Sequence, residues 1–278
     1  MGSIYYLNNG EKGVEETRLN WLHDKVIMPM VRNVLLPPHI KADLAAMSAP
    51  LIADIGAGSA SWPVTVAREL PHARIRGFDM DLSKFPTMLP SNVELGYGNV
   101  LEPFPEALQQ TFDLVHLRLL VGGIEKHDWV SAARNIMSLL RPGGWVIWEE
   151  TGLPVRNVLP PKPGWSKFAE LSWQVSDARN MDLRMPATLN RYLSEAGFVK
   201  LDEKVFNSAS DENLDGALNE MMIGLAEQSL AGIVADGSYE DMKTQEKLQS
   251  VMKDIRREFD EGSKSYWILH RVWGNKPV

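Results

Sequence analysis

A short glycine turn constrains this chain more than any other feature. Residues 51–61 read Leu-Ile-Ala-Asp-Ile-Gly-Ala-Gly-Ser-Ala-Ser, and a helical pattern starts directly afterwards at Trp62. The first part of the stretch has the apolar character of a buried strand. Gly56 and Gly58 accept positive φ and let a ligand approach the main chain closely. The helix that follows points its unpaired N–H groups toward the same place. The stretch therefore predicts a strand, a turn and a helix that together hold a nucleotide-like ligand.

Strands and helices alternate from this turn to residue 150. Each predicted strand is a short apolar run, as expected for a parallel sheet that is covered on both faces. Repeated strand–helix units predict a doubly wound α/β sheet, with ligands outside the carboxyl ends of its strands. The strands are predicted at Leu51–Asp54, Ile75–Asp79, Val93–Tyr97, Phe112–Leu117 and Trp145–Glu149, and the helices at 62–70, 83–88, 103–110 and 128–140.

Helical segments flank this core on both sides. Residues 15–36 repeat apolar side chains at helical spacing with a kink at Pro29, and a second short helix is predicted over His39–Met47. After residue 150 the pattern predicts helices at Trp165–Asn180 and Pro186–Ala196, a strand at Phe198–Phe206, helices over 211–261 with a break at 232–237, and a last strand at Tyr266–Trp273.

No clean boundary divides the chain, so one domain over residues 1–278 is predicted. Within it we expect an N-terminal helical cap (1–48), a cofactor-binding core (49–150), helical lid elements (151–197 and 207–262) and two terminal strands (198–206 and 264–274).

Charge and composition exclude several classes of function. The net charge of −7 argues against a nucleic-acid partner that is bound through its phosphates. Cysteine is absent, which excludes a disulfide framework, a thiolate nucleophile and a cysteine metal site, and no metal site is predicted. The sequence shows no secretory signal pattern and no apolar run of the roughly 18–20 residues that span a membrane. We therefore expect a cytoplasmic monomer or homodimer with a small-molecule partner.

The residues around the glycines favour one ligand over another. A dinucleotide fingerprint would carry a third glycine where this chain has Ser61. Asp54, two residues before the first glycine, would repel a pyrophosphate but suits an ammonium group, such as the amino-acid end of S-adenosylmethionine. Asp79 ends the second strand, where a carboxylate can accept hydrogen bonds from both ribose hydroxyls. Asp81 is the alternative for that role, and either acid can instead be a solvated turn residue.

The third and fourth strands end in further candidates. Asn99 can bind the edge of an adenine ring that Val100 covers, although asparagine after a strand is also an ordinary turn residue. Arg118 ends the fourth strand and is expected to bind the cofactor or the substrate. His116 lies inside that strand, where we interpret it as a core histidine with satisfied hydrogen bonds.

These motifs together resemble the class I methyltransferases. The resemblance is carried by Asp-Ile-Gly-Ala-Gly-Ser at 54–59, Gly-Phe-Asp-Met at 77–80, Phe-Asp-Leu-Val-His-Leu-Arg at 112–118, Leu-Arg-Pro-Gly-Gly-Trp at 140–145 and Trp-Glu-Glu at 148–150. More narrowly, the chain is similar to the LaeA-like and UMTA-type methyltransferases of fungal secondary metabolism over roughly 15–206 and 264–277. The resemblance implies a mostly parallel seven-stranded Rossmann-like sheet and S-adenosyl-L-methionine as cofactor. Asn99 departs from the family pattern, in which an acid is common at that position.

Methyl transfer requires little from catalytic side chains, because alignment of the reactants supplies much of the rate. The candidates for a general base are His23 on the N-terminal helix and Glu150 at the end of the fifth strand. His23 has a structural role as its alternative. Strand alternation lets only one of Glu149 and Glu150 face the site, and Glu149 is expected to contact substrate. Arg18 is expected to bind the cofactor carboxylate, or else to pair with a neighbouring acid on its helix.

Aromatic and methionine residues outside the core suit an apolar lid over a flat substrate. The lid candidates are Trp165, Phe168, Trp173, Met221 and Met222, of which Trp165, Trp173 and Met222 are the predicted substrate contacts, and core packing is the alternative for each of them. The leading hypothesis is S-adenosylmethionine-dependent methyl transfer to oxygen, nitrogen or sulfur of a small, largely apolar secondary metabolite. Two alternatives stay open: a LaeA-like regulatory protein that retains the pocket, and a methyltransferase-fold cyclase that uses the cofactor without consuming it.

Overall fold

A seven-stranded sheet forms the centre of the computed structural model, which describes residues 13–152, 158–182, 184–209 and 211–278. The strand order is β3-β2-β1-β4-β5-β9-β7, and β9 is antiparallel to both of its neighbours. The doubly wound fold predicted from the sequence is thereby confirmed. The strands are β1 (Leu51–Ile55), β2 (Arg74–Asp79), β3 (Val93–Tyr97), β4 (Phe112–Arg118), β5 (Leu140–Thr151), β7 (Val199–Asn207) and β9 (Ile268–Asn275).

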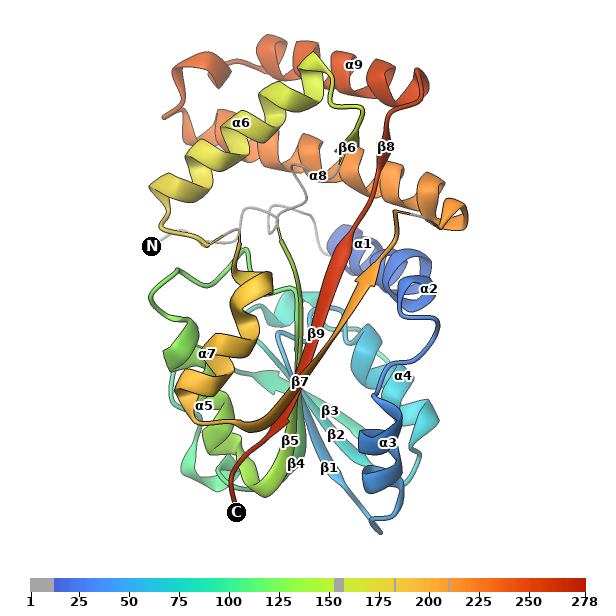
Figure 1. The fold of residues 1–278 in the computed structure, drawn as a ribbon, viewed down its shortest axis with the longest axis vertical. Helices are drawn as coiled ribbons and strands as arrows, with labels where there is room; N and C mark the ends of the chain where they lie inside the picture. The colour runs from blue at the N-terminus through green and yellow to red at the C-terminus, as the bar shows by residue number, and fades with distance from the viewer. Residues whose placement is uncertain (1–12, 153–157, 183, 210) are drawn as a thin grey trace.

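Helices cover both faces of the sheet (Figure 1). On one face lie α3 (Pro38–Ala45) and α4 (Ser61–Glu69), whose apolar side chains share a buried cluster with Ile52 and Ile75 of the sheet. On the other face lie α5 (Trp129–Leu139) and α7 (Leu189–Ala196), which pack against each other and against Val115 and Val146. Burial on both faces explains why the central strands are nearly continuous apolar runs.

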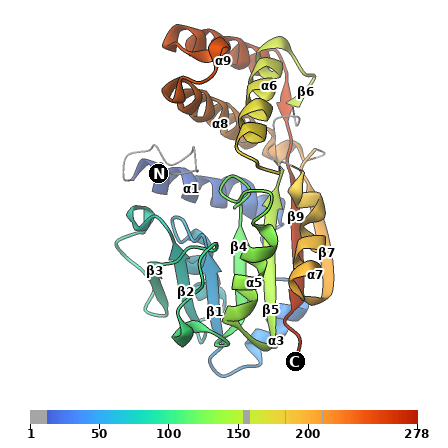
Figure 2. The same ribbon diagram turned by 90° about the vertical axis from the view of Figure 1, so that its left-hand side faces the viewer.

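A second layer of helices lies beyond the carboxyl ends of the parallel strands (Figure 2). It consists of α6 (Pro163–Ala178), α8 (Asp215–Asp236) and α9 (Gln245–Asp260), with a small ribbon of β6 (Val158–Leu159) and β8 (Lys264–Ser265). Between this layer and the sheet lies the N-terminal helix, α1 (Val14–Leu22), which continues through a π-helical turn, η2 (His23–Ile27), into α2 (Met28–Met30). The N-terminal helix is thus enclosed between two layers.

Three helix predictions need correction. Residues 83–88 and 103–110 form only short 3₁₀ turns, η3 (Leu82–Lys84) and η4 (Glu106–Leu108), because prolines interrupt both segments. The break expected at 232–237 comes later, since α8 continues to Asp236 and ends at Gly237 with φ of 70°. Further short 3₁₀ turns among the described residues are η6 (Met185–Thr188), η7 (Glu212–Leu214) and η8 (Glu240–Met242).

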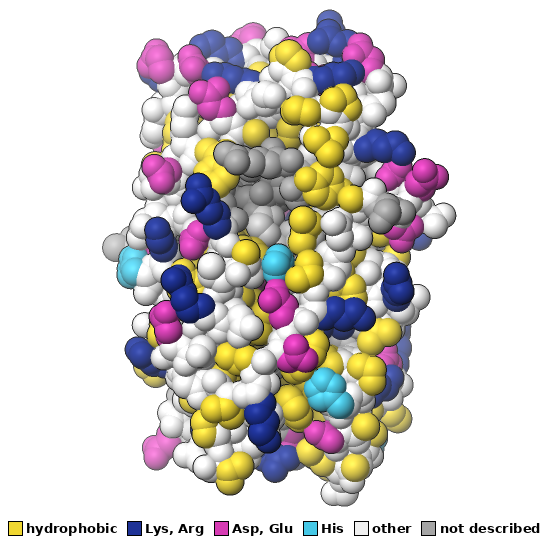
Figure 3. All heavy atoms as spheres, viewed as in Figure 1, with side chains coloured by type: hydrophobic (Ala, Val, Ile, Leu, Met, Phe, Trp, Pro, Cys, Tyr) yellow, Lys and Arg dark blue, Asp and Glu magenta, His cyan; other side chains and the backbone are white. Residues whose placement is uncertain are grey.

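The surface in Figure 3 carries interspersed acidic and basic side chains on the face shown, with no large basic patch there. None of the described helices combines the length and apolarity that a membrane span would require.

Candidate functional site

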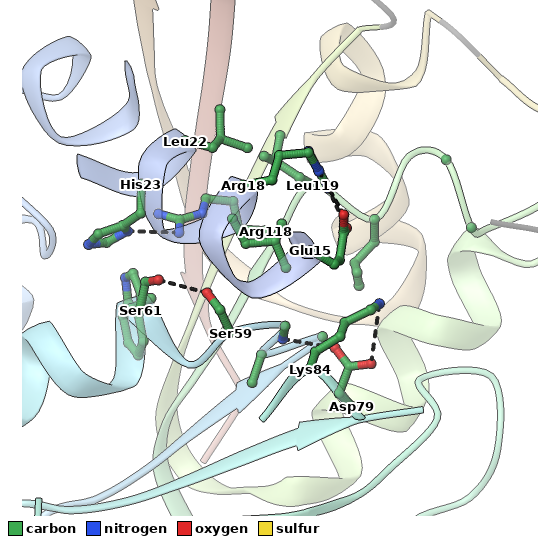
Figure 4. A pocket seen from close by; sticks show the side chains of 18 of the residues that line it. Glu15, Arg18, Leu22, His23, Ser59, Ser61, Asp79, Lys84, Arg118 and Leu119 are labelled. Carbon is green, nitrogen blue, oxygen red and sulfur yellow. Dashed lines mark hydrogen bonds and ion pairs between the residues drawn. The ribbon is translucent and has the colours of Figure 1, made fainter. Parts of the chain in front are cut away.

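A cavity of about 1150 Å³ lies where the carboxyl ends of the strands, the N-terminal helix and α8 meet. Its floor is formed by the ends of β1, β2 and β4 and by the glycine turn after β1 (Figure 4). All eight residues that the sequence analysis assigned to a cofactor line it: Arg18, Asp54, Gly56, Gly58, Asp79, Asn99, Val100 and Arg118. Pockets for one drug-sized ligand measure roughly 300–1,000 Å³, so this cavity is large enough for more than one small molecule.

The glycine turn forms a cradle that side chains would fill. Gly56 and Gly58 have φ of 74° and 55°. A Cβ built on Gly56 would lie 2.6 Å from Cδ2 of Leu120, and a Cβ on Gly58 would lie 3.0 Å from Cδ1 of Leu19. Glycine is therefore required at both positions for conformation and for space.

Asp79 is held at the edge of this cradle by two main-chain donors. Its Oδ2 accepts a hydrogen bond from the amide of Gly58 at 2.8 Å, and its Oδ1 accepts one from the amide of Asp81 at 2.9 Å. Lys84 lies 4.0 Å from both acids. Asp81 uses its carboxylate differently, since it accepts bonds from the amide and hydroxyl of Ser83 in the following 3₁₀ turn. The buried Asp79 is thus the better placed acid for a ligand lying on the glycine turn.

Asn99 uses its amide group for local structure. Its Oδ1 accepts a hydrogen bond from the amide of Leu101 at 3.0 Å, and its Nδ2 donates one to Glu102 at 3.0 Å. This geometry matches the turn interpretation that the sequence analysis kept as an alternative. Val100 is buried and presents an apolar wall to the cavity.

Four ionisable side chains form a row across the sheet at the floor of the cavity, which Asp54 and His116 line. Nδ1 of His116 on β4 lies 2.6 Å from Oδ1 of Asp54 on β1, and its Nε2 lies 3.4 Å from Oε2 of Glu149 on β5. Nε of Arg271 on β9 donates to Oε1 of Glu149 at 2.5 Å. The ring of His116 also stacks on Trp62, with centroids 3.8 Å apart and an angle of 1° between the planes. His116 is thus a core histidine with satisfied hydrogen bonds, as interpreted from the sequence.

His23 joins the N-terminal helix to this row through Arg118. A guanidinium nitrogen of Arg118 donates to Nδ1 of His23 at 3.0 Å, and Nε2 of His23 lies 3.2 Å from the hydroxyl of Thr65. Burial, reinforced by the positive charge of Arg118, lowers the pKa of His23 to about 3. The Nδ1 lone pair is therefore occupied and weakly basic. This geometry corresponds to the structural alternative for His23 and not to a general base.

Arg18 pairs with an acid one turn earlier on α1. Its Nε donates to Oε2 of Glu15 at 2.8 Å, and a second guanidinium nitrogen lies 2.5 Å from Oε1. Both residues line the cavity, and Glu15 is buried there. The ion pair considered from the sequence is therefore present.

The two acids that end β5 do not line the cavity, which corrects the expectation that one of them faces it. Glu149 is fully engaged in the row with Arg271 and His116, which hold its pKa well below the usual range although burial alone would raise it. Glu150 accepts hydrogen bonds from the amides of Leu120 and Val121 and from the indole of Trp148. Burial raises the pKa of Glu150 to about 8.

The predicted substrate contacts in the upper layer also need correction. Trp165 and Met222 are buried in the cluster between α6, α8 and α9, and Trp173 packs against the same cluster. None of the three lines the cavity, because the helical faces that carry them point toward one another. All three residues therefore pack in the hydrophobic core, which was the alternative considered for each.

The wall opposite the glycine turn comes mostly from residues that the sequence analysis did not assign, apart from the lid candidate Met221. The polar ones are Glu220 and Gln228 on α8, and the other apolar ones are Trp21, Leu22, Leu119, Leu225 and Trp267. Helical spacing places Glu220, Met221, Gly224, Leu225 and Gln228 on one side of α8, but only the packing of α8 over α1 turns that side toward the cavity.

A profile of the methyltransferase domain family matches residues 48–203. Methyltransferase grgD of a Penicillium species is 32% identical over 216 residues, which are 74% of this chain and 73% of that protein. N-methyltransferase sirN of Leptosphaeria maculans is 26% identical over 273 residues, covering 95% of this chain and 92% of that protein. The secondary metabolism regulator laeA of Gibberella zeae is 30% identical over 166 residues, covering 58% and 52% of the two chains.

Solved structures share the fold at low sequence identity. A phosphoethanolamine N-methyltransferase of Haemonchus contortus, in complex with phosphomonomethylethanolamine and S-adenosylhomocysteine, superposes with a TM-score of 0.59 at 14% identity. This chain is covered completely and spans 61% of that structure.

Proposed function

Because the chain belongs to the methyltransferase domain family and uses S-adenosylmethionine, we propose that it methylates oxygen, nitrogen or sulfur of a small, largely apolar secondary metabolite. One observation carries the proposal: a single cavity extends from the glycine turn to an apolar and aromatic wall of α1 and α8. The glycine turn takes the cofactor in this proposal, and the opposite wall takes the acceptor. The similarity to the N-methyltransferase sirN over nearly the whole chain makes nitrogen the first acceptor atom to test.

The residues at the glycine turn fit the cofactor. The cradle at Gly56 and Gly58 admits no side chain, and Asp79 keeps lone pairs available for ribose hydroxyls beside its two main-chain donors. Asp54 offers a carboxylate to the ammonium group, and Arg118 offers a guanidinium to the carboxylate of the same amino acid. Val100 covers one side of the adenine. When bound, the cofactor supplies an electrophilic methyl group on its sulfonium.

The chain promotes transfer chiefly by alignment and by excluding water. Fixing two reactants in line is worth about 7–11 kcal/mol of the barrier. Neither candidate base is placed for proton removal, since the lone pair of His23 is occupied by Arg118 and Glu150 does not line the cavity. The acceptor therefore reacts through a lone pair that it already presents, and it loses any proton to solvent after transfer.

The test is a screen with S-adenosylmethionine that carries a labelled methyl group. The protein is incubated with extracts of fungal secondary metabolites, and products are detected by mass spectrometry. We expect one or more products with a labelled methyl group, together with release of S-adenosylhomocysteine, and loss of both with Asp54→Ala. Cyclised product without cofactor consumption would support the cyclase alternative. Cofactor binding without labelled product in any extract would instead favour the regulatory alternative.

A further inference from the structure

The row of ionisable side chains at the floor of the cavity assigns a role to a residue that would not touch the acceptor. We infer that His116 is a positioning residue, which fixes one oxygen of Asp54 and thereby presents the other oxygen to the ammonium group of the cofactor. The inference rests on the proposed assignment of Asp54 to that group.

The first step concerns the protons on His116. Both of its ring nitrogens face carboxylates, at 2.6 Å from Asp54 and 3.4 Å from Glu149. An ionised carboxylate only accepts hydrogen bonds, so the ring nitrogen that faces Asp54 at 2.6 Å acts as the donor. The ring has no exposed surface and lies flat on Trp62. A partner at each ring nitrogen and the stacked indole therefore fix the orientation of His116.

The second step concerns the two oxygens of Asp54. Oδ1 is bonded to His116, whereas Oδ2 accepts no hydrogen bond from any residue that the structure describes. Asp54 is buried and lines the cavity. A buried carboxylate without a partner turns toward another donor. The bond from His116 holds Oδ1 of Asp54 in place and leaves Oδ2 as the oxygen that a ligand in the cavity can reach.

The third step explains why His116 itself stays in place. Glu149 lies against its other ring nitrogen, and Arg271 forms an ion pair with Glu149 in turn. Arg271 is fixed by a further bond of 2.8 Å from its guanidinium to the main-chain oxygen of Val34. The row spans β1, β4, β5 and β9, so the position of Asp54 is set by the whole width of this part of the sheet.

The test uses two ligands that differ in the group concerned. S-adenosylhomocysteine carries the amino acid, whereas methylthioadenosine keeps the adenosine and sulfur but has no ammonium group. Two variants separate the two ring nitrogens. The side-chain amide nitrogen of Asn in His116→Asn lies about where Nδ1 lies, and that of Gln in His116→Gln lies about where Nε2 lies. Dissociation constants are measured by calorimetry for the parent and both variants, with thermal unfolding as a check of folding.

We expect His116→Gln to lose affinity for S-adenosylhomocysteine by about tenfold or more, the scale of one hydrogen bond to a charged group, and to keep its affinity for methylthioadenosine. His116→Asn is expected to retain most of the affinity for both ligands. Equal losses for both ligands would show a merely structural role and overturn the inference. Unchanged or higher affinity of His116→Gln for S-adenosylhomocysteine would also overturn it.

Asp54→Asn separates this inference from the assignment on which it rests. If Asp54→Asn leaves the ratio of the two affinities unchanged, Asp54 does not bind the ammonium group and both ideas fail. If Asp54→Asn changes the ratio and His116→Gln does not, only the role of His116 fails.

Discussion

Arg118 on the central strand β4 donates a hydrogen bond of 3.0 Å to Nδ1 of His23 on the N-terminal helix. The bond crosses the boundary between the sheet and the helix that covers the cavity. It also occupies the nitrogen that a general base would use. A histidine with a pKa of about 3 has too little affinity for a proton to serve as a base near neutral pH.

His23→Asn is expected to keep kcat within about tenfold of the parent, because asparagine can present Oδ1 to Arg118 in place of Nδ1. A true general base contributes about 10²–10⁴-fold. The measurement is the pH–rate profile with an acceptor identified in the screen, and His23→Ala serves as the variant that leaves Arg118 without this partner. A loss of 10² or more in His23→Asn, with the loss of a pH inflection, would restore the catalytic role.

Glu150 and His23 change the free energy of unfolding in opposite directions as pH rises. The folded pKa of Glu150 is raised from 4.5 to about 8, so its contribution is complete below pH 4.5 and is lost as pH rises to 8. The folded pKa of His23 is lowered from 6.5 to about 3, so its contribution is complete above pH 6.5 and is lost as pH falls to 3. The two effects oppose each other between pH 4.5 and 6.5, and only that of Glu150 acts between pH 6.5 and 8.

Glu150→Gln should therefore abolish a decrease in the free energy of unfolding between pH 6.5 and 8, which amounts to about 2 kcal/mol at roughly 1.4 kcal/mol per pH unit. Chemical denaturation at several pH values measures it. Below pH 4.5 Glu150 is protonated in both the folded and the unfolded state while His23 still titrates, so the two curves should run parallel there, which is the internal control. Parallel curves for parent and variant from pH 6.5 to 8 would contradict the prediction.

Asp79→Ala is expected to weaken binding of S-adenosylhomocysteine by about 10–100-fold, since it removes the carboxylate that would accept the ribose hydroxyls. Asp81→Ala is the matched control, because Asp81 is on the same turn but bonds Ser83. Asp81→Ala should change the dissociation constant for S-adenosylhomocysteine by no more than a few-fold, because it removes only the cap of a short, exposed turn. Calorimetry distinguishes the two, and a larger loss in Asp81→Ala would exchange their roles.

Two adjacent methionines on α8 lie in different surroundings, one in the cavity wall and the other in the core. Met221 lines the cavity, whereas Met222 is fully buried between the upper helices. Met222→Ala should lower the free energy of unfolding by about 2–5 kcal/mol and leave the KM for the acceptor unchanged. Met221→Ala should raise the KM for the acceptor with a much smaller loss of stability. Chemical denaturation measures the stability of both variants, and steady-state kinetics measures their KM for the acceptor. An unchanged KM in Met221→Ala would contradict the proposal that α8 contacts the acceptor.

Local sequence patterns were sufficient to predict which residues around the glycine turn line the cavity. The glycines at 56 and 58 and the acid at 79 act through main-chain geometry next to their own strands, so their positions at the cavity follow from the order of strand, turn and helix. The opposite wall of the cavity could not be predicted in this way. Trp165 and Met222 are large apolar residues at helical spacing, as are the residues that line the cavity wall. Only the packing of α6, α8 and α9 against one another buries Trp165 and Met222 in the core.

The sequence by itself determined the sheet, the glycine turn and the cofactor, because each depends on short runs of residues that specify backbone conformation. Tertiary structure alone decided what the titratable groups do. His116 meets Asp54, Glu149 meets Arg271 and Arg118 meets His23 across 62, 122 and 95 positions of sequence. Partners at such separations are fixed by strand order and helix packing, and burial and the neighbouring charges then shift the pKa values of His23 and Glu149.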